Sequence, residues 1–396
     1  MHDSKTITES YSDMALHFSA KEFVTRRRSA VQAMVERGLD GMLHFRQESM
    51  YYLTGYDTFG FCFFQCLYLG ADSRVTLLTR APDLRQAEHT SDIEDIRIWV
   101  DGPDRHPVDD LQDILQQHGC RGHRLGVEYD AHGLTAYNGK RLDAALEGFA
   151  TLVDASDLVG RLRMIKSAAE LQYVNRAAEL ADRALERATE LTRPGAFEGD
   201  ILAAMHTEIF SGDGDYPGNE FIIGSGPDAL LVRYSSGRRT LSERDQLTLE
   251  FAGVFRHYHC ALMRTFIIGE PETDQLSMYD AVRDGMAAGL EALKPGAPLG
   301  DVFDAYRQVV DPRGYGPHRF NACGYSLGAT FTPSWMDWPM LYHGNPTIAE
   351  PNMVLFPHMV LMNSETKRAM ALGQTVLVTQ DGVKRLSRVP LDLVVR

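Results

Sequence analysis

The sequence has few cysteines, no long apolar run and no excess of basic residues. Its five cysteines are odd in number and follow no spacing typical of a metal site or a disulfide framework. This usage argues against a disulfide-stabilised secreted fold and favours a reducing compartment, so we expect a cytoplasmic protein. No stretch reaches the ~18 consecutive apolar residues of a membrane-spanning helix, so a membrane is not an expected partner.

The charge balance excludes a further class of partner. Lysine and arginine number 40 against 54 aspartates and glutamates, which gives a formal net charge of −14. A chain this acidic lacks the positive surface that binds phosphate backbones, so nucleic acid is not an expected partner. The first 20 residues are polar and acidic, without the basic start and apolar centre of a signal peptide.

Length and pattern predict two domains, because 396 residues exceed what one compact core usually holds. In residues 1–157 predicted strands alternate with predicted helices, which indicates an α/β domain. One expected strand covers the aromatic run at residues 59–69, with Phe61 and Phe63 on one face. Residues 158–396 open with a long helical pattern at 158–191 and continue with mixed helices and strands, so we expect a second, α+β domain there.

The stretch at residues 247–269 carries most of the reactive side chains and is predicted to form a hairpin. Apolar and polar residues alternate along its first strand, and Ala252-Gly253 is the expected turn. Alternation then places these side chains on one face of the return strand: His257, His259, Ala261 and Met263. The plain interpretation is a hairpin with one solvated face. The functional one is a pocket shared with Glu250, because burying an acid and imidazoles is costly without a role.

Several segments in order resemble the creatinase/aminopeptidase P/prolidase family (M24), whose catalytic domain has the pita-bread fold. They are "RLRMIKSAAELQYVNRAAELAD", "LTLEFAGVFRHYHCALMRTFIIGEP", "LKPGAPLGDVFDAYRQVV", "CGYSLGATFTP" and "EPNMVLFPHMV" with "LGQTVLVTQDG". The N-terminal half, with "LDGMLHFRQESMYYLTGY", resembles the smaller α/β domain of that family. The resemblance covers the chain from about residue 20 onward. It implies a creatinase-like α/β domain and a pita-bread α+β catalytic domain. We also expect a homodimer, because the aromatic strand at residues 59–64 is too apolar to be left in water.

The metal-ligand positions of the family are mostly lost. Metal-dependent members use two aspartates, one histidine and two glutamates. By the resemblance, these positions fall on Glu250, Ala261, Tyr325, His358 and Gly373. One carboxylate and one imidazole cannot bridge two cations, so we expect no dinuclear metal site and no other cofactor.

The segments "LTGYDTFGFCFFQ" and "GYSLGATFTP" bring the chain nearest to the ectoine hydrolases of this family, which open a cyclic amidine. This chain and those enzymes share a glutamate at the first metal-ligand position, here Glu250, and a tyrosine in place of the metal-binding histidine, here Tyr325. The resemblance implies a metal-independent hydrolase that cleaves a non-peptide C–N bond in a small zwitterion. The positions of the catalytic histidine, glutamate and arginine of creatinase fall on Arg233, Met263 and Phe63, so creatine cleavage is not expected.

Three side chains are expected to carry the reaction. Glu250 is the candidate nucleophile or base, and its structural alternative is a carboxylate paired with a nearby arginine. His259 and His358 are the candidate proton donors, and for each the alternative is a core histidine whose hydrogen bonds are satisfied.

The expected substrate contacts come from loops and strand ends. Arg233 could clamp a carboxylate or lie solvated on its loop. Tyr325 could donate a hydrogen bond or simply pack. Trp335 and Trp338 suggest an aromatic cage for a cation, or a packed loop. The other expected pocket residues are Phe61, Phe63, His257, Met263 and Asn219.

Two other functions compete with this prediction. One is a metal-dependent Xaa-Pro dipeptidase or aminopeptidase, which the lost ligand positions disfavour. The other is a catalytically inactive member that kept a pocket for a small molecule.

Overall fold

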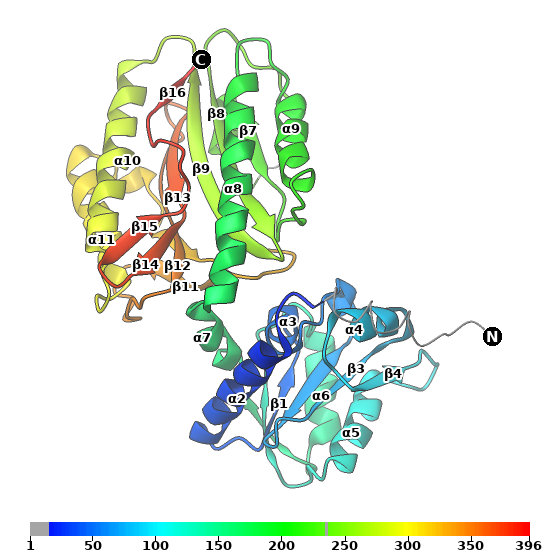
Figure 1. The fold of residues 1–396 in the computed structure, drawn as a ribbon. Coiled ribbons are helices and arrows are strands. Elements are labelled where there is room, and N and C mark those ends of the chain that lie inside the picture. Colours follow the sequence, from blue (N-terminus) through cyan, green and yellow to red (C-terminus); the bar gives the residue numbers. More distant parts are fainter. Residues whose placement is uncertain (1–15, 234–236) are drawn as a thin grey trace. The chain divides into compact units, whose positions relative to one another are not determined.

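The computed structural model describes residues 16–233 and 237–396, so most of the polar start of the chain lies outside the described part. The chain divides into two compact units, Met1–Arg163 and Met164–Arg396 (Figure 1). The sequence had placed this division at 157/158, at the start of helix α7 (Leu158–Met164). The five cysteines are free thiols, and within the described ranges no helix is long and apolar enough to cross a membrane.

The N-terminal unit is an α/β domain, as predicted. Its six-stranded sheet has the order β4-β3-β2-β1-β5-β6, in which β2 runs antiparallel to β1 and β3 and the other pairs are parallel. The strands are β1 (Gly41–His44), β2 (Cys66–Gly70), β3 (Val75–Arg80), β4 (Asp95–Trp99), β5 (Arg124–Val127) and β6 (Thr151–Asp154). The helices are α2 (Ala20–Glu36), α3 (Gln47–Thr54), α4 (Leu84–Thr90), α5 (Pro107–Gln117) and α6 (Ala136–Leu146).

The predicted aromatic strand at residues 59–69 is wrong in its first half. Gly60–Cys62 forms a 3-10 turn, and strand β2 begins only at Cys66. Phe61 is buried, whereas Phe63 is half exposed and lies under the guanidinium of Arg80, 4.4 Å from the ring centre. The run is apolar enough for a strand, but one phenylalanine is buried in the core and the other lies partly exposed at the surface.

The C-terminal unit is an α+β domain built on a ten-stranded sheet. Its main path has the order β11-β10-β12-β13-β9-β8-β7; β14 pairs with β12 and β15, and β16 pairs with β9. The strands are β7 (Ile222–Ser225), β8 (Asp245–Phe255), β9 (Tyr258–Ile268), β10 (Ala322–Ser326), β11 (Asp337–Tyr342), β12 (Val354–Asn363), β13 (Arg368–Gln374), β14 (Val376–Thr379), β15 (Gly382–Arg385) and β16 (Val394–Val395). The helices are α8 (Ala168–Leu191), α9 (Glu198–Phe210), α10 (Thr273–Ala292) and α11 (Gly300–Val310).

The predicted helix at 158–191 is two helices rather than one. Ser167 caps α8: its hydroxyl accepts the amide of Glu170, whose carboxylate accepts the amide of Ser167 in return. This capping box starts a new helix three residues after α7 ends.

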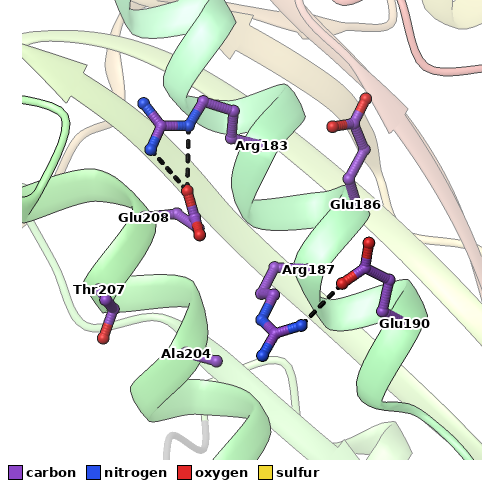
Figure 2. Close-up of a pocket in the computed structure, with 7 residues that line it drawn as sticks. All are labelled: Arg183, Glu186, Arg187, Glu190, Ala204, Thr207 and Glu208. Carbon is purple, nitrogen blue, oxygen red and sulfur yellow. Dashed lines mark hydrogen bonds and ion pairs between the residues drawn. The ribbon is translucent and has the colours of Figure 1, made fainter.

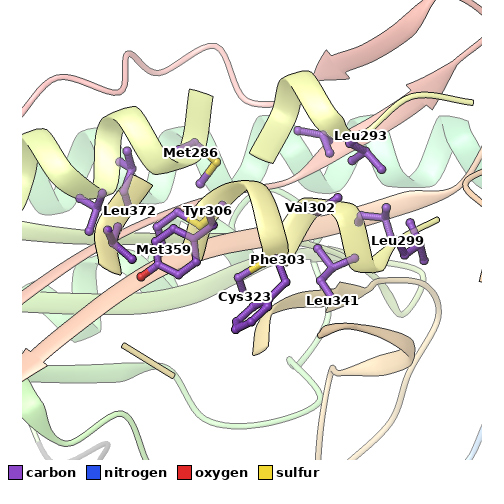
Figure 3. Packing of buried hydrophobic residues seen from close by; sticks show 14 of the residues in the cluster. Met286, Leu293, Leu299, Val302, Phe303, Tyr306, Cys323, Leu341, Met359 and Leu372 are labelled. Atoms are coloured by element: carbon purple, nitrogen blue, oxygen red, sulfur yellow. The ribbon is translucent and has the colours of Figure 1, made fainter. Parts of the chain in front are cut away.

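Helices α8 and α10 cover one face of the large sheet (Figure 1). Gly253 of β8 faces α8, because a Cβ atom there would lie 2.0 Å from the carbonyl oxygen of Ala177. Met359 of β12 packs into the core beneath α10 and α11 with Met286 and Tyr306 (Figure 3). Since side chains alternate across a strand, the neighbours of Gly253 and Met359 face the opposite side of the sheet.

The central hairpin is present, but its turn lies further along than predicted. Strands β8 and β9 pair from Asp245↔Ile268 to Phe255↔Tyr258, and the turn residues are Arg256 and His257. Both have positive φ, 51° and 63°, which fits the primed two-residue turns of hairpins. Gly253 lies inside β8, where α8 approaches too closely for a side chain, so glycine marks a packing contact there.

Candidate active site

Residues of four neighbouring strands form one row on the face of the sheet opposite α8 and α10. Glu250 of β8 pairs with Met263 of β9, Met263 pairs with Gly373 of β13, and Gly373 pairs with His358 of β12. Residues paired directly across antiparallel strands have side chains on the same face. Tyr325 of β10 pairs with Phe356, two residues from His358, and so joins this face.

A cavity of about 160 Å³ opens over this row. Its polar lining consists of Arg233, Glu250, Tyr325 and His358, and three thioether side chains form much of the wall: Met263, Met336 and Met340. All of these except Met336 and Met340 are predicted from the sequence. Those two, like Phe320 and Val360 in the same wall, carry no group whose chemistry distinguishes them from core residues.

Glu250 is the central charged group of the cavity. Its side chain is 8% exposed, and burial raises the pKa of its carboxyl to about 7. The hydrogen bond from Tyr325 and the positive charge of Arg233 act in the opposite direction and favour the ionised form. A carboxyl with a pKa near neutrality is suited to take up and release a proton.

Tyr325 and Trp335 form a short hydrogen-bonded chain that ends on Glu250. The hydroxyl of Tyr325 donates to Oε1 of Glu250 at 3.1 Å, and Nε1 of Trp335 donates to the Tyr325 hydroxyl at 2.9 Å. Burial and the neighbouring Glu250 carboxylate raise the pKa of Tyr325 well above its usual value, so the phenol keeps its proton.

The two tryptophans that were expected to form an aromatic cage have different surroundings. Trp335 is 1% exposed and donates a hydrogen bond to the cavity residue Tyr325, whereas Trp338 is 36% exposed. Neither is among the described residues that line the cavity. Asn219, another expected contact, accepts the backbone amide of Trp335 at 3.2 Å and so supports the same loop.

His358 lies in the cavity beside Tyr325, with ring centres 5.5 Å apart. Burial lowers the pKa of this imidazole to about 4, and the positive charge of Arg233 adds to the effect. Its Nδ1 atom is buried and has no hydrogen-bond partner among the residues that the structure describes. A neutral imidazole in the cavity is therefore available to a ligand.

His259 faces the same side of the hairpin as Glu250, but it pairs with Val254, four residues along β8. At about 3.3 Å per residue this separates the two by roughly 13 Å along the strand. Its Nε2 accepts the backbone amide of Gly218 at 2.9 Å, and its Nδ1 lies near the carbonyl of Gly328 and the hydroxyl of Thr330. Burial lowers its pKa to about 4. These contacts match its structural alternative, a core histidine with satisfied hydrogen bonds.

His257, Phe61 and Phe63 are not among the described residues that line the cavity. His257 stands in the hairpin turn and stacks on Phe331, with ring centres 4.2 Å apart. Phe61 and Phe63 belong to the N-terminal unit. The described residues that line the cavity belong to the C-terminal unit.

The residues of this site do not fit a pair of divalent cations. Position 373 has no room for a carboxylate, because a Cβ atom there would lie 2.7 Å from the ring of Phe356 and 2.8 Å from Cβ of Met263. The cavity offers one carboxylate and one imidazole, with the cation of Arg233 beside them. Among the described residues no group of three His, Cys, Asp or Glu side chains could hold a metal ion.

A second hollow on the C-terminal unit lies between α8 and α9 (Figure 2). Arg183 donates two hydrogen bonds to Glu208, at 3.0 and 2.7 Å, and Arg187 donates to Glu190 at 2.7 Å. These arginines are partly exposed and already paired, so the hollow is lined by one ion pair between the two helices and one within α8.

Comparison with known proteins gives matches over both units. The family model for metallopeptidase family M24 matches residues 172–380, and the creatinase/prolidase N-terminal domain matches residues 26–165. Ectoine hydrolase from Halomonas elongata is 28% identical over 97% of this chain and 99% of its own length. A Xaa-Pro dipeptidase from Pyrococcus furiosus is 25% identical over 60% of this chain and 67% of its own length.

The solved structures give the same fold. Dipeptidase PepE from Mycobacterium ulcerans superposes with a TM-score of 0.82 at 23% identity, covering 96% of this chain and 99% of that chain. A Xaa-Pro dipeptidase from Bacillus anthracis gives 0.82 at 20% identity, covering 94% and 100%. The predicted creatinase-like domain and pita-bread domain are thereby confirmed. This chain therefore belongs to metallopeptidase family M24 and is a hydrolase of that family, with a creatinase/prolidase-type domain preceding its pita-bread domain.

Proposed function

We propose that this protein hydrolyses a C–N bond other than a peptide bond in a small zwitterionic metabolite, and that it does so without a metal ion. The observation that carries the proposal is the row Glu250, Met263, Gly373 and His358, in which a buried carboxyl stands where the family places its first metal ligand. The whole-length similarity to an ectoine hydrolase supports the same reaction class.

The size and lining of the cavity support a small, charged substrate. A volume of about 160 Å³ suits a compact metabolite better than a peptide. The guanidinium of Arg233 can bind a substrate carboxylate with two parallel hydrogen bonds. The three methionines of the cavity wall can pack against the apolar carbons of a substrate ring, since thioether side chains adapt to irregular shapes.

In this mechanism Glu250 acts on an amidine-like carbon. The ionised carboxylate either takes a proton from the attacking water or attacks the carbon itself, in which case water then hydrolyses the covalent intermediate and restores the carboxylate. The planar carbon becomes tetrahedral, the C–N bond breaks, and its electrons go to the leaving nitrogen, which takes up a proton released by the water. His358, neutral and lining the cavity, is the imidazole that can accept that proton and pass it to the nitrogen. His259, which is bonded to Gly218 and lies outside the cavity lining, is assigned no role in the transfer.

A metal-dependent Xaa-Pro dipeptidase remains the second candidate, favoured by the Pyrococcus furiosus relative. The experiment that separates the two is a substrate screen with metal analysis. Cyclic amidines including ectoine, guanidino acids, betaines and Xaa-Pro dipeptides are incubated with the purified protein and followed by mass spectrometry.

We expect turnover of an amidine or related zwitterion that survives treatment with a chelator, by a protein with less than stoichiometric divalent metal. The reason is that the site offers too few carboxylates to bridge cations. Elemental analysis showing on the order of two metal ions per chain, with Xaa-Pro cleavage lost to chelator and restored by manganese, would contradict the proposal.

The pH dependence of kcat/KM should report Glu250. The carboxyl must be ionised to act, and its pKa is about 7, so the rate should fall as the pH drops through 7 and level off above it. His358, with a pKa of about 4, remains neutral across this window and adds no second limb. Initial rates at constant ionic strength test this; a rate that stays flat down to about pH 5 would rule out Glu250 as the titrating group.

A further inference from the structure

The hydrogen bonds around Tyr325 have a defined direction. An indole N–H can only donate a hydrogen bond, so Nε1 of Trp335 is the donor and the Tyr325 oxygen is the acceptor, at 2.9 Å. The phenol has a single proton of its own. With its oxygen already accepting from Trp335, that proton points to Oε1 of Glu250 at 3.1 Å. The order of donation is therefore Trp335 to Tyr325 to Glu250.

Trp335 is itself held by a segment that precedes strand β7. Its backbone amide donates to Oδ1 of Asn219 at 3.2 Å. Gly218 lies against the same loop so closely that a Cβ atom would be 2.8 Å from the backbone of Ser334 and from the amide nitrogen of Trp335. Glycine at position 218 is thus required by a backbone-to-backbone contact.

His259 fixes this segment to the hairpin. The amide of Gly218 donates to its Nε2 at 2.9 Å, so that nitrogen carries no proton and the imidazole is neutral with its proton on Nδ1. Thr330 and the carbonyl of Gly328 lie at 3.2 and 3.4 Å from Nδ1 and complete the arrangement. A histidine expected to move protons instead holds the loop that carries Trp335.

We propose that Trp335 is a positioning residue, whose indole N–H fixes the Tyr325 hydroxyl proton on Glu250 and thereby sets the orientation and the proton affinity of that carboxylate. The inference rests on the proposed function, because it gives Trp335 a role through the carboxylate assigned to the reaction. It also replaces the aromatic cage expected from two nearby tryptophans.

The consequence is a measurable change in Glu250 itself. A hydrogen bond donated to a carboxylate stabilises its ionised form. Without the indole N–H, the phenol can rotate and spend part of its time donating elsewhere. Trp335→Phe should therefore raise the pKa of Glu250, and Tyr325→Phe should raise it further because the donor itself is lost. The other charged or titratable groups of the cavity, Arg233 and His358, are unchanged in both variants.

The test is a pH titration of the carboxyl by infrared difference spectroscopy on the intact, ligand-free protein. The band of protonated Glu250 is identified by its absence in Glu250→Gln. We expect its midpoint to move upward in Trp335→Phe, and we expect Trp335→Phe to cause no further change in a Tyr325→Phe background, since it acts through that hydroxyl. With a confirmed substrate, kcat/KM at neutral pH should fall on the order of 10- to 100-fold in Tyr325→Phe and by less in Trp335→Phe.

The matched control is Trp99→Phe. Trp99 is also buried, and its Nε1 donates to the carbonyl of Phe64 at 2.9 Å in the N-terminal unit, so the same chemical change is made away from the site. The inference is overturned if the titration midpoint of Glu250 is the same in Trp335→Phe as in Trp99→Phe. It is also overturned if the shift persists in the Tyr325→Phe background, because Trp335 would then act by packing alone.

Should Trp335→Phe fail to fold, site-specific replacement by 3-benzothienylalanine keeps the shape of the ring and removes only the N–H, so the same titration can be made. A shifted midpoint without any change in turnover would support the positioning of Glu250 and reject its proposed catalytic function, so the two failures are distinguishable.

Discussion

Glu250→Gln is expected to abolish turnover while leaving the fold intact. Glutamine keeps the volume of the side chain and an oxygen that can accept from Tyr325, but it can neither attack a carbon nor take up a proton. Loss of a nucleophile or base should slow the reaction by at least ~10²–10⁴-fold. Single-turnover kinetics with a confirmed substrate measure this. A variant that keeps more than about a tenth of the wild-type rate would refute the mechanism.

The same substitution is expected to stabilise the protein above neutral pH. The folded carboxyl has a pKa of about 7, against 4.5 as its ordinary value. Between these values the folded state holds more protons than the unfolded state, so wild-type stability falls as the pH rises. The full penalty, about 3 kcal/mol, is reached above pH 7, and it is absent in Glu250→Gln.

The control for this effect is Glu291→Gln, which removes an exposed carboxylate from α10 of the same unit. Denaturant unfolding at about pH 8 and pH 4 should show Glu250→Gln more stable than wild type only at the higher pH, and Glu291→Gln nearly unchanged at both. Equal stability of wild type and Glu250→Gln at the higher pH would mean that the buried carboxyl carries no such cost.

Gly253→Ala is expected to be among the most destabilising single substitutions in the sheet. The added methyl group would lie 2.0 Å from the carbonyl oxygen of Ala177 and 2.4 Å from the amide nitrogen of Ala181. Both are backbone atoms of α8, so no side chain can rotate away and the helix must move off β8. Overpacking of this kind costs up to ~3 kcal/mol or more, which is roughly 6–12 °C in Tm for a unit of this size.

The comparison is Gly160→Ala in α7, where a Cβ atom would have no heavy atom within 4 Å. Alanine favours helix over glycine by about 1 kcal/mol, so this variant should be as stable as wild type or slightly more so. Thermal unfolding of both variants gives the answer. A Gly253→Ala protein that melts with the wild type would show that α8 does not press on β8 as closely as the structure indicates.

Much of the candidate site could be predicted because strand alternation is a local property. The period of two along residues 247–269 predicts Met263 on the histidine-bearing face of a hairpin, and the functional interpretation adds Glu250 to that face; the structure pairs the two directly. The order of short motifs predicted the family, and its ligand positions led to His358, Tyr325 and Gly373. All of these except Gly373, which has no side chain to contribute, line one cavity.

The wrong predictions concern residues whose structural role depends on contacts with residues far away in the sequence. The sequence predicts a turn at Gly253 because glycine tolerates unusual backbone angles, but the close approach of α8 is what requires glycine there. Phe61 and Phe63 share a hydrophobic pattern although one is buried and the other half exposed. Trp335 and Trp338 are close in sequence, yet Trp335 is buried and donates to Tyr325, whereas Trp338 is 36% exposed.

By itself the sequence determined the two-domain organisation, the α/β and pita-bread folds, and the presence of a single carboxylate and a single imidazole at the family's ligand positions. The two domains and their α/β and α+β classes follow from length and local periodicity, whereas the pita-bread fold and the ligand positions follow from the resemblance of short motifs to a known family. The tertiary structure alone decided that His259 holds a loop, that Trp335 acts through Tyr325, and that Phe356 and Met263 fill the space above Gly373. Each of these depends on atoms brought within about 3 Å by strands and loops far apart in the chain, and local pattern carries no record of such contacts.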